Sequence, residues 1–355
     1  MGKLELIKEV GEEIITEEEL KSLLEIKKHP VAYDGFEPSG TNIHIAQGLL
    51  RAININKMIN AGFKFKILIA DWHAWANNKM GGNLEHIQKV GKYYIEVWKA
   101  CGMDLNGVEF VWASDLVKDD NYWKIVMQVA RHSTVNRVIR CSQIMGRKES
   151  EALQASQILY PCMQVADIFH LKVDVVQLGM DQRKVNVLAR EVGPKIGFYK
   201  PIAVHHHMLM GLGQPPKDLT GADRGIALKM SKSKPDTAIF MTDSADEINR
   251  KIKKAYCPEG VIEENPILEY CKYIIFEKFD NFKIERPEKW GGNLEFDSYD
   301  KLEDSFVKKE LHPMDLKVTV ADYLNKLLDP IRKKLENNKT AQRLAKEIEK
   351  FKITR

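Results

Sequence analysis

Short apolar runs alternate with longer amphipathic stretches through the first two-thirds of the chain, and this alternation limits the possible folds more than any other feature. The apolar runs have the length of buried strands, and the stretches between them have helical periodicity. The expected strands are residues 30–33, 65–70, 108–113 and 173–178, and the expected helices include residues 84–100 and a segment through residues 52 and 58. Strand–helix–strand repetition predicts a Rossmann-like α/β fold, a parallel sheet with helices on both faces. Ligands of such sheets bind beyond the carboxyl ends of the strands.

The chain of 355 residues is long enough for about two domains. Residues from about 115 to 160 carry helical periodicity without a strand pattern and are interpreted as a helical insertion between the two halves of the sheet. From about residue 244 onward the pattern is almost all helical, interrupted by prolines. We therefore expect an α/β domain at residues 1–243 and a helical domain at residues 244–355.

Composition excludes several classes of protein. No run approaches the ~18 apolar residues of a spanning helix, and the N-terminus lacks the apolar core of a secretory signal. The five cysteines are odd in number and none are at C-x-x-C spacing, which favours reduced thiols and a cytoplasmic location over a disulfide or zinc framework. The three histidines at 205–207 do not predict a metal site, because consecutive residues of a strand face opposite sides.

Positive charge is concentrated at the C-terminus. The formal net charge of the whole chain is +4, whereas residues 331–355 contain nine Lys or Arg and three Asp or Glu. A lysine-rich terminal helix is often only a solvated surface. The alternative is an electrostatic approach surface for a polyanion such as RNA.

The first polar motif, YDGFEPSG at residues 33–40, follows the first expected strand and precedes His44 at the start of a helix. Backbone N–H groups at a helix N-terminus bind phosphate readily. An imidazole there can stabilise the charge that builds on a reacting phosphate. A single histidine near a helix start is more often structural, so this motif alone leaves both interpretations open.

The second motif is KMSKS at residues 229–233, in a stretch without clear periodicity. Lysines on a loop can fold over a triphosphate and neutralise a departing pyrophosphate. On composition alone, an ordinary exposed basic loop is the better interpretation.

The third motif, YPCMQVAD at residues 160–167, predicts a helix with Pro161 in its first turn. Helical spacing then places Tyr160, Gln164 and Asp167 on one face. This polar stripe either faces solvent or lines a pocket that hydrogen-bonds a polar ligand.

The fourth motif, GMDQRK at residues 179–184, follows the expected strand at 173–178 and so lies at the carboxyl edge of the sheet. There Asp181 can accept hydrogen bonds from ribose hydroxyls, and Gln182 can orient an amino acid. Arg183 and Lys184 can reach nucleic-acid phosphates or bases. Simple solvation of a strand end is the alternative.

In their order and spacing the four motifs together resemble class I aminoacyl-tRNA synthetases, in particular the tyrosyl-tRNA synthetases of the archaeal and eukaryotic type. KKAYCP at 253–258, RPEKWGG at 286–292 and LHPMDLK at 311–317 extend the resemblance to residues 32–335, nearly the whole chain. The resemblance implies a tyrosine–tRNA ligase of cytoplasmic translation. Such an enzyme activates L-tyrosine with ATP and transfers the tyrosyl group to the 3′ end of tRNA(Tyr).

Site residues follow from the resemblance where this sequence matches the family motifs. Tyrosine binding is implied for Tyr33, Gly35, Glu37, His73, Tyr160, Gln164, Asp167 and Gln182, with Tyr33 and Asp167 holding the phenol. Catalysis is implied for His44, Gln47, Lys229 and Lys232, and ATP binding for His44, Gly179, Asp181, Met230 and Lys232. The implied cofactor is ATP with Mg²⁺, without a metal bound tightly by the protein itself.

The resemblance also implies the partners of the chain. Arg183 and Lys184 match residues that read the first base pair of the tRNA acceptor stem, while Trp290, His312 and Asp315 match residues that contact the anticodon. Residues 244–355 would then be the anticodon-binding domain. The family implies a homodimer, with contacts from the helical insertion and none with a membrane.

One motif departs from the family pattern. The HIGH signature reads HIAQ here, with Ala46 and Gln47 in its last two positions. Gln47 can donate a hydrogen bond but cannot carry a positive charge. This departure is the only support for a synthetase-like RNA-binding protein without catalysis. A tryptophanyl-tRNA synthetase and another nucleotidyltransferase of the same sheet fold are the remaining alternatives.

Overall fold

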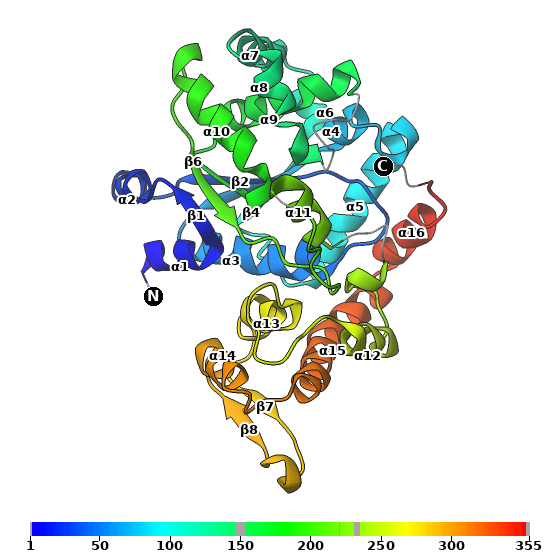
Figure 1. The fold of residues 1–355 in the computed structure, drawn as a ribbon. Coiled ribbons are helices and arrows are strands. Elements are labelled where there is room, and N and C mark those ends of the chain that lie inside the picture. The colour runs from blue at the N-terminus through cyan, green and yellow to red at the C-terminus, as the bar shows by residue number, and fades with distance from the viewer. Residues whose placement is uncertain (1, 146–152, 220, 231–234, 353–355) are drawn as a thin grey trace. The chain divides into compact units, whose positions relative to one another are not determined.

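A computed structural model describes residues 2–145, 153–219, 221–230 and 235–352 (Figure 1). The chain forms two compact units. The first unit comprises Met1–Thr41, Asn54–Met208 and Arg343–Arg355, and the second comprises Asn42–Ile53 and Leu209–Gln342. The division into domains at residues 1–243 and 244–355 stays a prediction.

A six-stranded sheet in the order β1-β6-β5-β2-β3-β4 organises the first unit. Five neighbouring strands are parallel, and β1 pairs antiparallel with β6 at one edge. The strands are β1 (Gly11–Ile15), β2 (Val31–Phe36), β3 (Lys64–Ile69), β4 (Val108–Trp112), β5 (Val175–Gly179) and β6 (Ile202–His206). The sequence-based expectation of β2 to β5 and of a Rossmann-like parallel sheet is confirmed. The edge strand β1 and its neighbour β6 were not expected.

Helices cover both faces of this sheet. Leu68 of β3 belongs to the apolar cluster that contains Val165 and Ile168 of helix α9 (Ala155–His170). Its neighbour Ile69 points to the opposite face. There a Cβ atom at Gly91 of helix α5 would lie 2.7 Å from the Ile69 side chain, so α5 packs closely on the strand. The central strands are therefore buried on both sides, as in other parallel sheets.

The helices of the first unit follow the expected alternation with strands. Helix α5 has the predicted bounds. The region interpreted as a helical insertion forms α6, α7 and α8, followed by the start of α9. The bounds are α1 (Lys3–Val10), α2 (Glu17–Ile26), α3 (Arg51–Asn60), α4 (Asp71–Ala76), α5 (Leu84–Ala100), α6 (Ala113–Leu116), α7 (Asp120–Arg131), α8 (Val135–Ile139), α9 (Ala155–His170) and α10 (Arg183–Val192).

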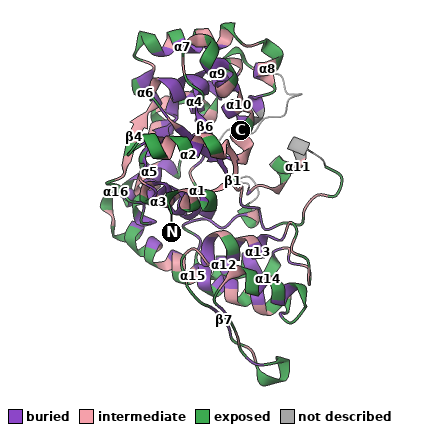
Figure 2. Cartoon of the chain, turned by 90° about the vertical axis from the view of Figure 1, so that its left-hand side faces the viewer, coloured by how far each residue is buried: buried purple, intermediate pink, exposed green. Residues whose placement is uncertain are grey.

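Helix α9 is the central helix of the first unit, and Figure 2 shows it largely buried. The expectation that Pro161 lies in the first turn is wrong. The helix begins at Ala155, where the Gln157 side chain accepts a hydrogen bond from the Gln154 backbone N–H at 3.0 Å. Pro161 lies inside the helix and lacks the N–H that would bond to the carbonyl four residues earlier.

The second unit is mainly helical. Its elements are α11 (Gly221–Leu228), α12 (Ala245–Lys254), α13 (Pro266–Tyr270), β7 (Phe282–Ile284), β8 (Leu294–Phe296), α14 (Tyr299–Val307), α15 (Pro313–Asn337) and the start of α16 (Lys339–Ile348). Leu316, Val320, Leu324 and Leu328 form a buried stripe along α15. The short β7–β8 hairpin is the exception in a region whose sequence pattern is almost all helical. No helix among the described residues combines the length and apolarity needed to cross a membrane.

Candidate active site

Asp167 of α9 is the centre of a buried polar cluster in the first unit. Its side chain is inaccessible to solvent. The Tyr122 hydroxyl, from α7, donates a hydrogen bond to Asp167 Oδ1 at 2.9 Å. His73 Nε2, from α4, lies 2.9 Å from Asp167 Oδ2. The polar stripe of α9 therefore does not face solvent, and its role in binding a ligand stays a prediction.

Tyr33 reaches the same cluster from strand β2. The side chain is 1% exposed, and a Cβ atom at position 35 would lie 2.7 Å from its hydroxyl oxygen. Glycine at position 35 therefore leaves the space that the Tyr33 phenol occupies. Tyr33 and Asp167 both act electrostatically on Tyr122 and on Tyr160. Burial is the largest cause that raises the pKa of Tyr122 well above its usual range, and Asp167 and Tyr33 add to it. The predicted pair thus faces one cluster, from a strand and from a helix.

The remaining residues assigned to tyrosine lie around this cluster. The rings of His73 and Tyr160 meet edge to face, with centroids 5.1 Å apart. Gln164 Nε2 donates to Gln182 Oε1 at 3.1 Å, which joins α9 to the turn after β5. Glu37 accepts a hydrogen bond from Asn77 Nδ2 at 2.9 Å, and its charge acts on Tyr160. The structure therefore brings together the side chains assigned to tyrosine.

His73 carries an electrostatic signature of this cluster. Burial lowers the pKa of His73, but the carboxylates of Asp167, Glu37 and Asp71 together outweigh burial, and the pKa is raised above its ordinary value. The folded protein therefore favours the imidazolium form of a side chain that is 1% exposed. The short contact with the Asp167 carboxylate holds the His73 ring in one orientation.

We expect the stabilisation from the His73–Asp167 contact to decline with increasing pH. Because the folded-state pKa of His73 is raised, its contribution is fully present below the unfolded pKa of about 6.5 and is lost as pH rises through the folded pKa. His73→Gln should therefore reduce the free energy of unfolding more at about pH 5.5 than at about pH 9. Urea unfolding across this range measures the difference, with exposed His29→Gln as control. A difference that grows with pH contradicts the assignment.

Tyr122 is the functional side chain that sequence reasoning missed. It belongs to the buried face of α7 with Ile125, Val126 and Val129, and that pattern is typical of core residues. Only the packing of α7 on α9 shows that its hydroxyl meets Asp167, 45 residues later. No local signal distinguishes it from an ordinary core tyrosine.

The turn after β5 places the fourth motif at the carboxyl edge of the sheet, as expected. Gly179 ends the strand, and a Cβ atom there would lie 2.7 Å from Asp181 Oδ1, so the turn has no room for a larger residue. Asp181 is partly buried, and its charge acts on Tyr160. Arg183 and Lys184 then open helix α10, with the Arg183 side chain 48% exposed.

The HIAQ segment belongs to the second unit. His44 pairs with Phe240 in an antiparallel bridge, and the Ile45 N–H donates to the Ile239 carbonyl at 2.8 Å. The next residues, Ala46–Leu50, form one π-helical turn, a feature frequent at functional sites. His44 and Gln47 are therefore held on a segment that is pinned to residues 239–241.

The same unit anchors both flanks of KMSKS. At the start of the motif, its first residue Lys229 pairs with Met210, and its second, Met230, is buried with its sulfur 3.9 Å from the Tyr270 hydroxyl. After it, the Thr237 carbonyl accepts a hydrogen bond from the Leu212 N–H at 2.9 Å. The predicted catalytic residue Lys232 lies outside the described residues, together with Ser231, Ser233 and Lys234.

Residues assigned to the anticodon lie at two places in the second unit. Trp290, in the turn between β7 and β8, is 65% exposed, so it does not pack into a core. Exposed His312 caps α15, where its ring accepts a hydrogen bond from the Met314 N–H at 3.2 Å, and Asp315 follows in the first turn.

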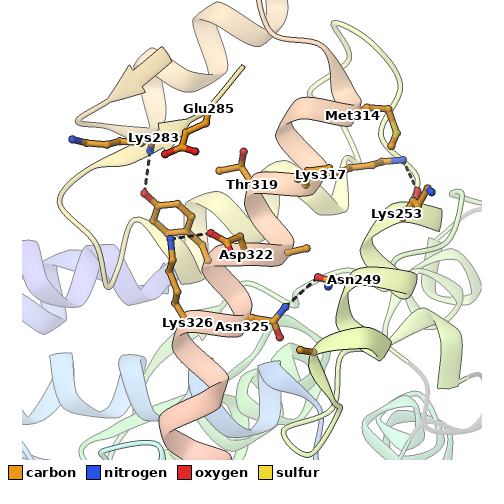
Figure 3. Close-up of a pocket in the computed structure, with 14 residues that line it drawn as sticks. Asn249, Lys253, Lys283, Glu285, Met314, Lys317, Thr319, Asp322, Asn325 and Lys326 are labelled. Atoms are coloured by element: carbon orange, nitrogen blue, oxygen red, sulfur yellow. Dashed lines mark hydrogen bonds and ion pairs between the residues drawn. The ribbon is translucent and has the colours of Figure 1, made fainter. Parts of the chain in front are cut away.

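A cavity of about 930 Å³ lies next to that first turn (Figure 3). It is lined by residues of α12, α15 and strand β7 with its flank. Met314 and Lys317, which flank Asp315, line it, and the Lys317 ammonium donates to the Lys253 carbonyl at 3.3 Å. Its lining carries mixed charge, because lysines stand beside the carboxylates of Glu285 and Asp322.

Whether the protein itself could bind Mg²⁺ depends on which oxygen and nitrogen ligands its side chains offer. Among the described residues, no group of three His, Cys, Asp or Glu side chains is placed to hold a metal ion. Mg²⁺ that arrives on ATP needs only one or two protein carboxylates, because phosphates and water supply its other ligands.

Comparison with known proteins decides which chemistry this arrangement serves. The family described as "tRNA synthetases class I (W and Y)" matches residues 25–329. The chain is also 51% identical to "Tyrosine--tRNA ligase 1, cytoplasmic" of Arabidopsis thaliana, over 99% of this chain and 89% of that protein. The chain belongs to the tyrosine–tRNA ligase family. As such it is a class I aminoacyl-tRNA synthetase, which uses ATP.

Solved structures agree with the assignment of this chain to the tyrosine–tRNA ligase family. The tyrosyl-tRNA synthetase of Pyrococcus horikoshii, complexed with L-tyrosine, matches with a TM-score of 0.88 at 39% identity, over 98% of this chain and 100% of that one. The tryptophanyl-tRNA synthetase of Aeropyrum pernix matches at 19% identity with a TM-score of 0.69, over 96% of this chain and 85% of that one. The second likeness shows a shared fold alone, so the tryptophanyl alternative has no further support.

Proposed function

We propose that this ligase activates L-tyrosine with ATP and transfers it to tRNA(Tyr), and that the cluster around Asp167 recognises the substrate phenol. The observation that carries this assignment is the buried carboxylate of Asp167 with Tyr122 and His73 on its two oxygens and Tyr33 facing the same cluster. A carboxylate offers about four lone-pair directions, so these contacts leave room for a substrate hydroxyl. Phenylalanine would leave the polar groups unpaired, which is costly in a buried site.

The amino-acid end of tyrosine is assigned to the side chains at the mouth of this cluster. Gln164 and Gln182, bonded to each other, and Tyr160 would hold the ammonium group. Gly35 leaves space beside the Tyr33 hydroxyl, and Glu37 lies close enough to influence Tyr160 electrostatically. Together with His73, these groups would fix the substrate carboxylate for attack, which is the positioning contribution to catalysis.

The reaction is assigned to two steps. The tyrosine carboxylate attacks the α-phosphorus of ATP, the bond to the pyrophosphate oxygen breaks, and tyrosyl-adenylate forms. The ribose hydroxyl at the 3′ end of tRNA then attacks the adenylate carbonyl and releases AMP. Neither step needs a covalent enzyme intermediate, so rate enhancement comes from orientation and charge stabilisation.

Phosphate chemistry is assigned to residues of both signature segments. His44 and Gln47 would donate to the α-phosphate, and Lys229 and Lys232 would neutralise the departing pyrophosphate. Gly179 and Asp181 would hold the ribose, and Met230 would contact the adenine. Mg²⁺ bound to the phosphates would neutralise part of their charge.

RNA contacts are assigned to exposed cations and to one aromatic ring. Arg183 and Lys184 would read the first acceptor base pair, as guanidinium and ammonium groups read base edges. Trp290 would stack on an anticodon base that His312 and Asp315 contact, since stacking on aromatic rings is typical of single-stranded RNA recognition. The basic C-terminal region would add non-specific attraction to RNA.

Organisation and location complete the proposal. Residues 1–243 would form the catalytic domain and residues 244–355 the anticodon-binding domain. The ligase would act as a homodimer joined through its helical insertion, in the cytoplasm, like the plant relative whose name states that location. Sedimentation analysis tests the dimer directly.

The test of the proposed function is ATP–pyrophosphate exchange measured with each of the twenty amino acids. Exchange with tyrosine alone supports the proposal. Exchange with tryptophan would show the rival specificity. Failure with all twenty would show that the HIAQ departure has removed catalysis and that the chain binds RNA without activating an amino acid.

We expect Trp290→Ala to raise the KM for tRNA about tenfold, because loss of one base–aromatic stack costs about 1–3 kcal/mol. Steady-state aminoacylation of tRNA(Tyr) measures the change. Val307→Ala, which truncates another exposed apolar side chain of the same unit, is the control. An unchanged KM would show that Trp290 does not contact the anticodon.

A further inference from the structure

Four side chains form a closed polar network where β1 pairs with β6. Glu13 and His205 are directly opposite each other in the two strands. Arg183 and Asn186 lie three residues apart in the first turn of α10 and so share one face of that helix. Arg183 is hydrogen-bonded to Glu13, Glu13 to His205, and His205 to Asn186, so helix α10 is tied to strands β1 and β6.

His205 fixes the position of the Glu13 carboxylate. Its ring is fully buried, and burial lowers its pKa, so the imidazole is neutral at pH 7. Nε2 lies 3.0 Å from the Asn186 amide nitrogen and therefore accepts its hydrogen bond. The single ring proton is then on Nδ1, which donates to Glu13 Oε2 at 2.8 Å. A neutral imidazole thus orients the carboxylate without cancelling its charge.

Glu13 in turn fixes the Arg183 guanidinium. Arg183 Nε lies 2.9 Å and 2.8 Å from the two Glu13 oxygens, although the arginine side chain is 48% exposed. A guanidinium carries five N–H donors in a rigid fork, and this contact uses one. A free arginine side chain has about 2 kcal/mol of rotamer entropy, part of which an unheld Arg183 would lose only on binding RNA.

The geometry points to Glu13 as a positioning residue that orients Arg183 for reading the first base pair of the tRNA acceptor stem. This inference rests on the proposed role of Arg183. Glu13 has no direct contact with RNA in this account, since a carboxylate repels phosphate. It acts by holding the fork of Arg183 in one direction before tRNA arrives, which favours specificity rather than general affinity.

Glu13→Gln tests the inference, because it keeps the shape of the side chain and removes its charge. The readout is the ratio of kcat/KM for aminoacylation of two tRNA(Tyr) transcripts, one with the native first base pair and one with that pair reversed. We expect the ratio to fall about tenfold, while tyrosine-dependent pyrophosphate exchange and the Tm stay unchanged. Glu12→Gln is the matched control: it removes the same charge one residue away, from a carboxylate that bonds to His207 at 3.1 Å. Its ratio should not change.

A double-mutant cycle with Arg183→Ala separates the possible outcomes. If Arg183→Ala alone leaves the ratio unchanged, the proposed role of Arg183 is wrong. If Arg183→Ala lowers the ratio but Glu13→Gln does not, only the positioning role of Glu13 is overturned. An equal effect of Glu13→Gln with and without Arg183 also overturns it. Should Glu13→Gln unfold, Glu13→Asp, which keeps the charge but shortens the reach, takes its place in the same cycle.

Discussion

Replacing Asp167 with alanine should lower the preference for tyrosine over phenylalanine by about 10- to 100-fold, measured as the ratio of kcat/KM in pyrophosphate exchange. The variant removes the only carboxylate placed on α9 within the tyrosine-assigned cluster, and the substrate hydroxyl loses its charged acceptor. Hydrogen bonds to charged groups contribute about 1.5–3 kcal/mol, and a buried hydroxyl without a partner costs about 1–3 kcal/mol. Phenylalanine has no hydroxyl, so it binds better once the buried carboxylate is removed from the pocket.

Two further variants separate recognition from damage to the pocket. Tyr122→Phe keeps the Asp167 carboxylate while removing one of its donors, and it should alter the preference much less. Asp167→Asn keeps the shape and one acceptor oxygen, and it should give an intermediate ratio. A purely structural role for Asp167 would lower the rates with both amino acids equally. An unchanged ratio in Asp167→Ala would therefore disprove its role in recognising the phenol.

The fold was predictable where burial leaves an uninterrupted apolar run. Strands β2, β3 and β5 lie inside the sheet and consist largely of apolar residues, as strands covered on both faces must, and β4 at one edge still keeps an apolar run. Strand β1 is an edge strand with two glutamates, and β6 ends in histidines, so neither has a run that stands out. The three-residue strands β7 and β8 are too short for any periodicity. Their pairing depends on contacts between segments, which a local pattern does not contain.

The candidate site was predictable only in part. The spacing of Tyr160, Gln164 and Asp167 placed them on one helix face, but their burial depends on the helices packed around α9. The individual roles came from resemblance to a family, not from spacing. Tyr122 lay within a pattern typical of a core face, and its contact with Asp167 is a tertiary fact. Local patterns therefore locate polar groups, whereas packing decides which of them meet.

Replacing Lys232 with alanine should lower the rate of adenylate formation about 100- to 1000-fold and change the dissociation constant for tyrosine by less than about threefold. Negative charge builds on the pyrophosphate oxygens only as the bond to the α-phosphorus breaks, so a donor aimed at them stabilises the transition state more than the bound substrate. The motif enters and leaves through segments that are pinned within the second unit at Met210 and Leu212. Rapid-mixing fluorescence gives the rate and equilibrium dialysis the affinity, with Lys234→Ala as the control that removes the same charge two residues away. Equal losses in rate and in tyrosine affinity would show that Lys232 supports ground-state binding, and the assignment of the KMSKS lysine to the leaving group would have to be abandoned.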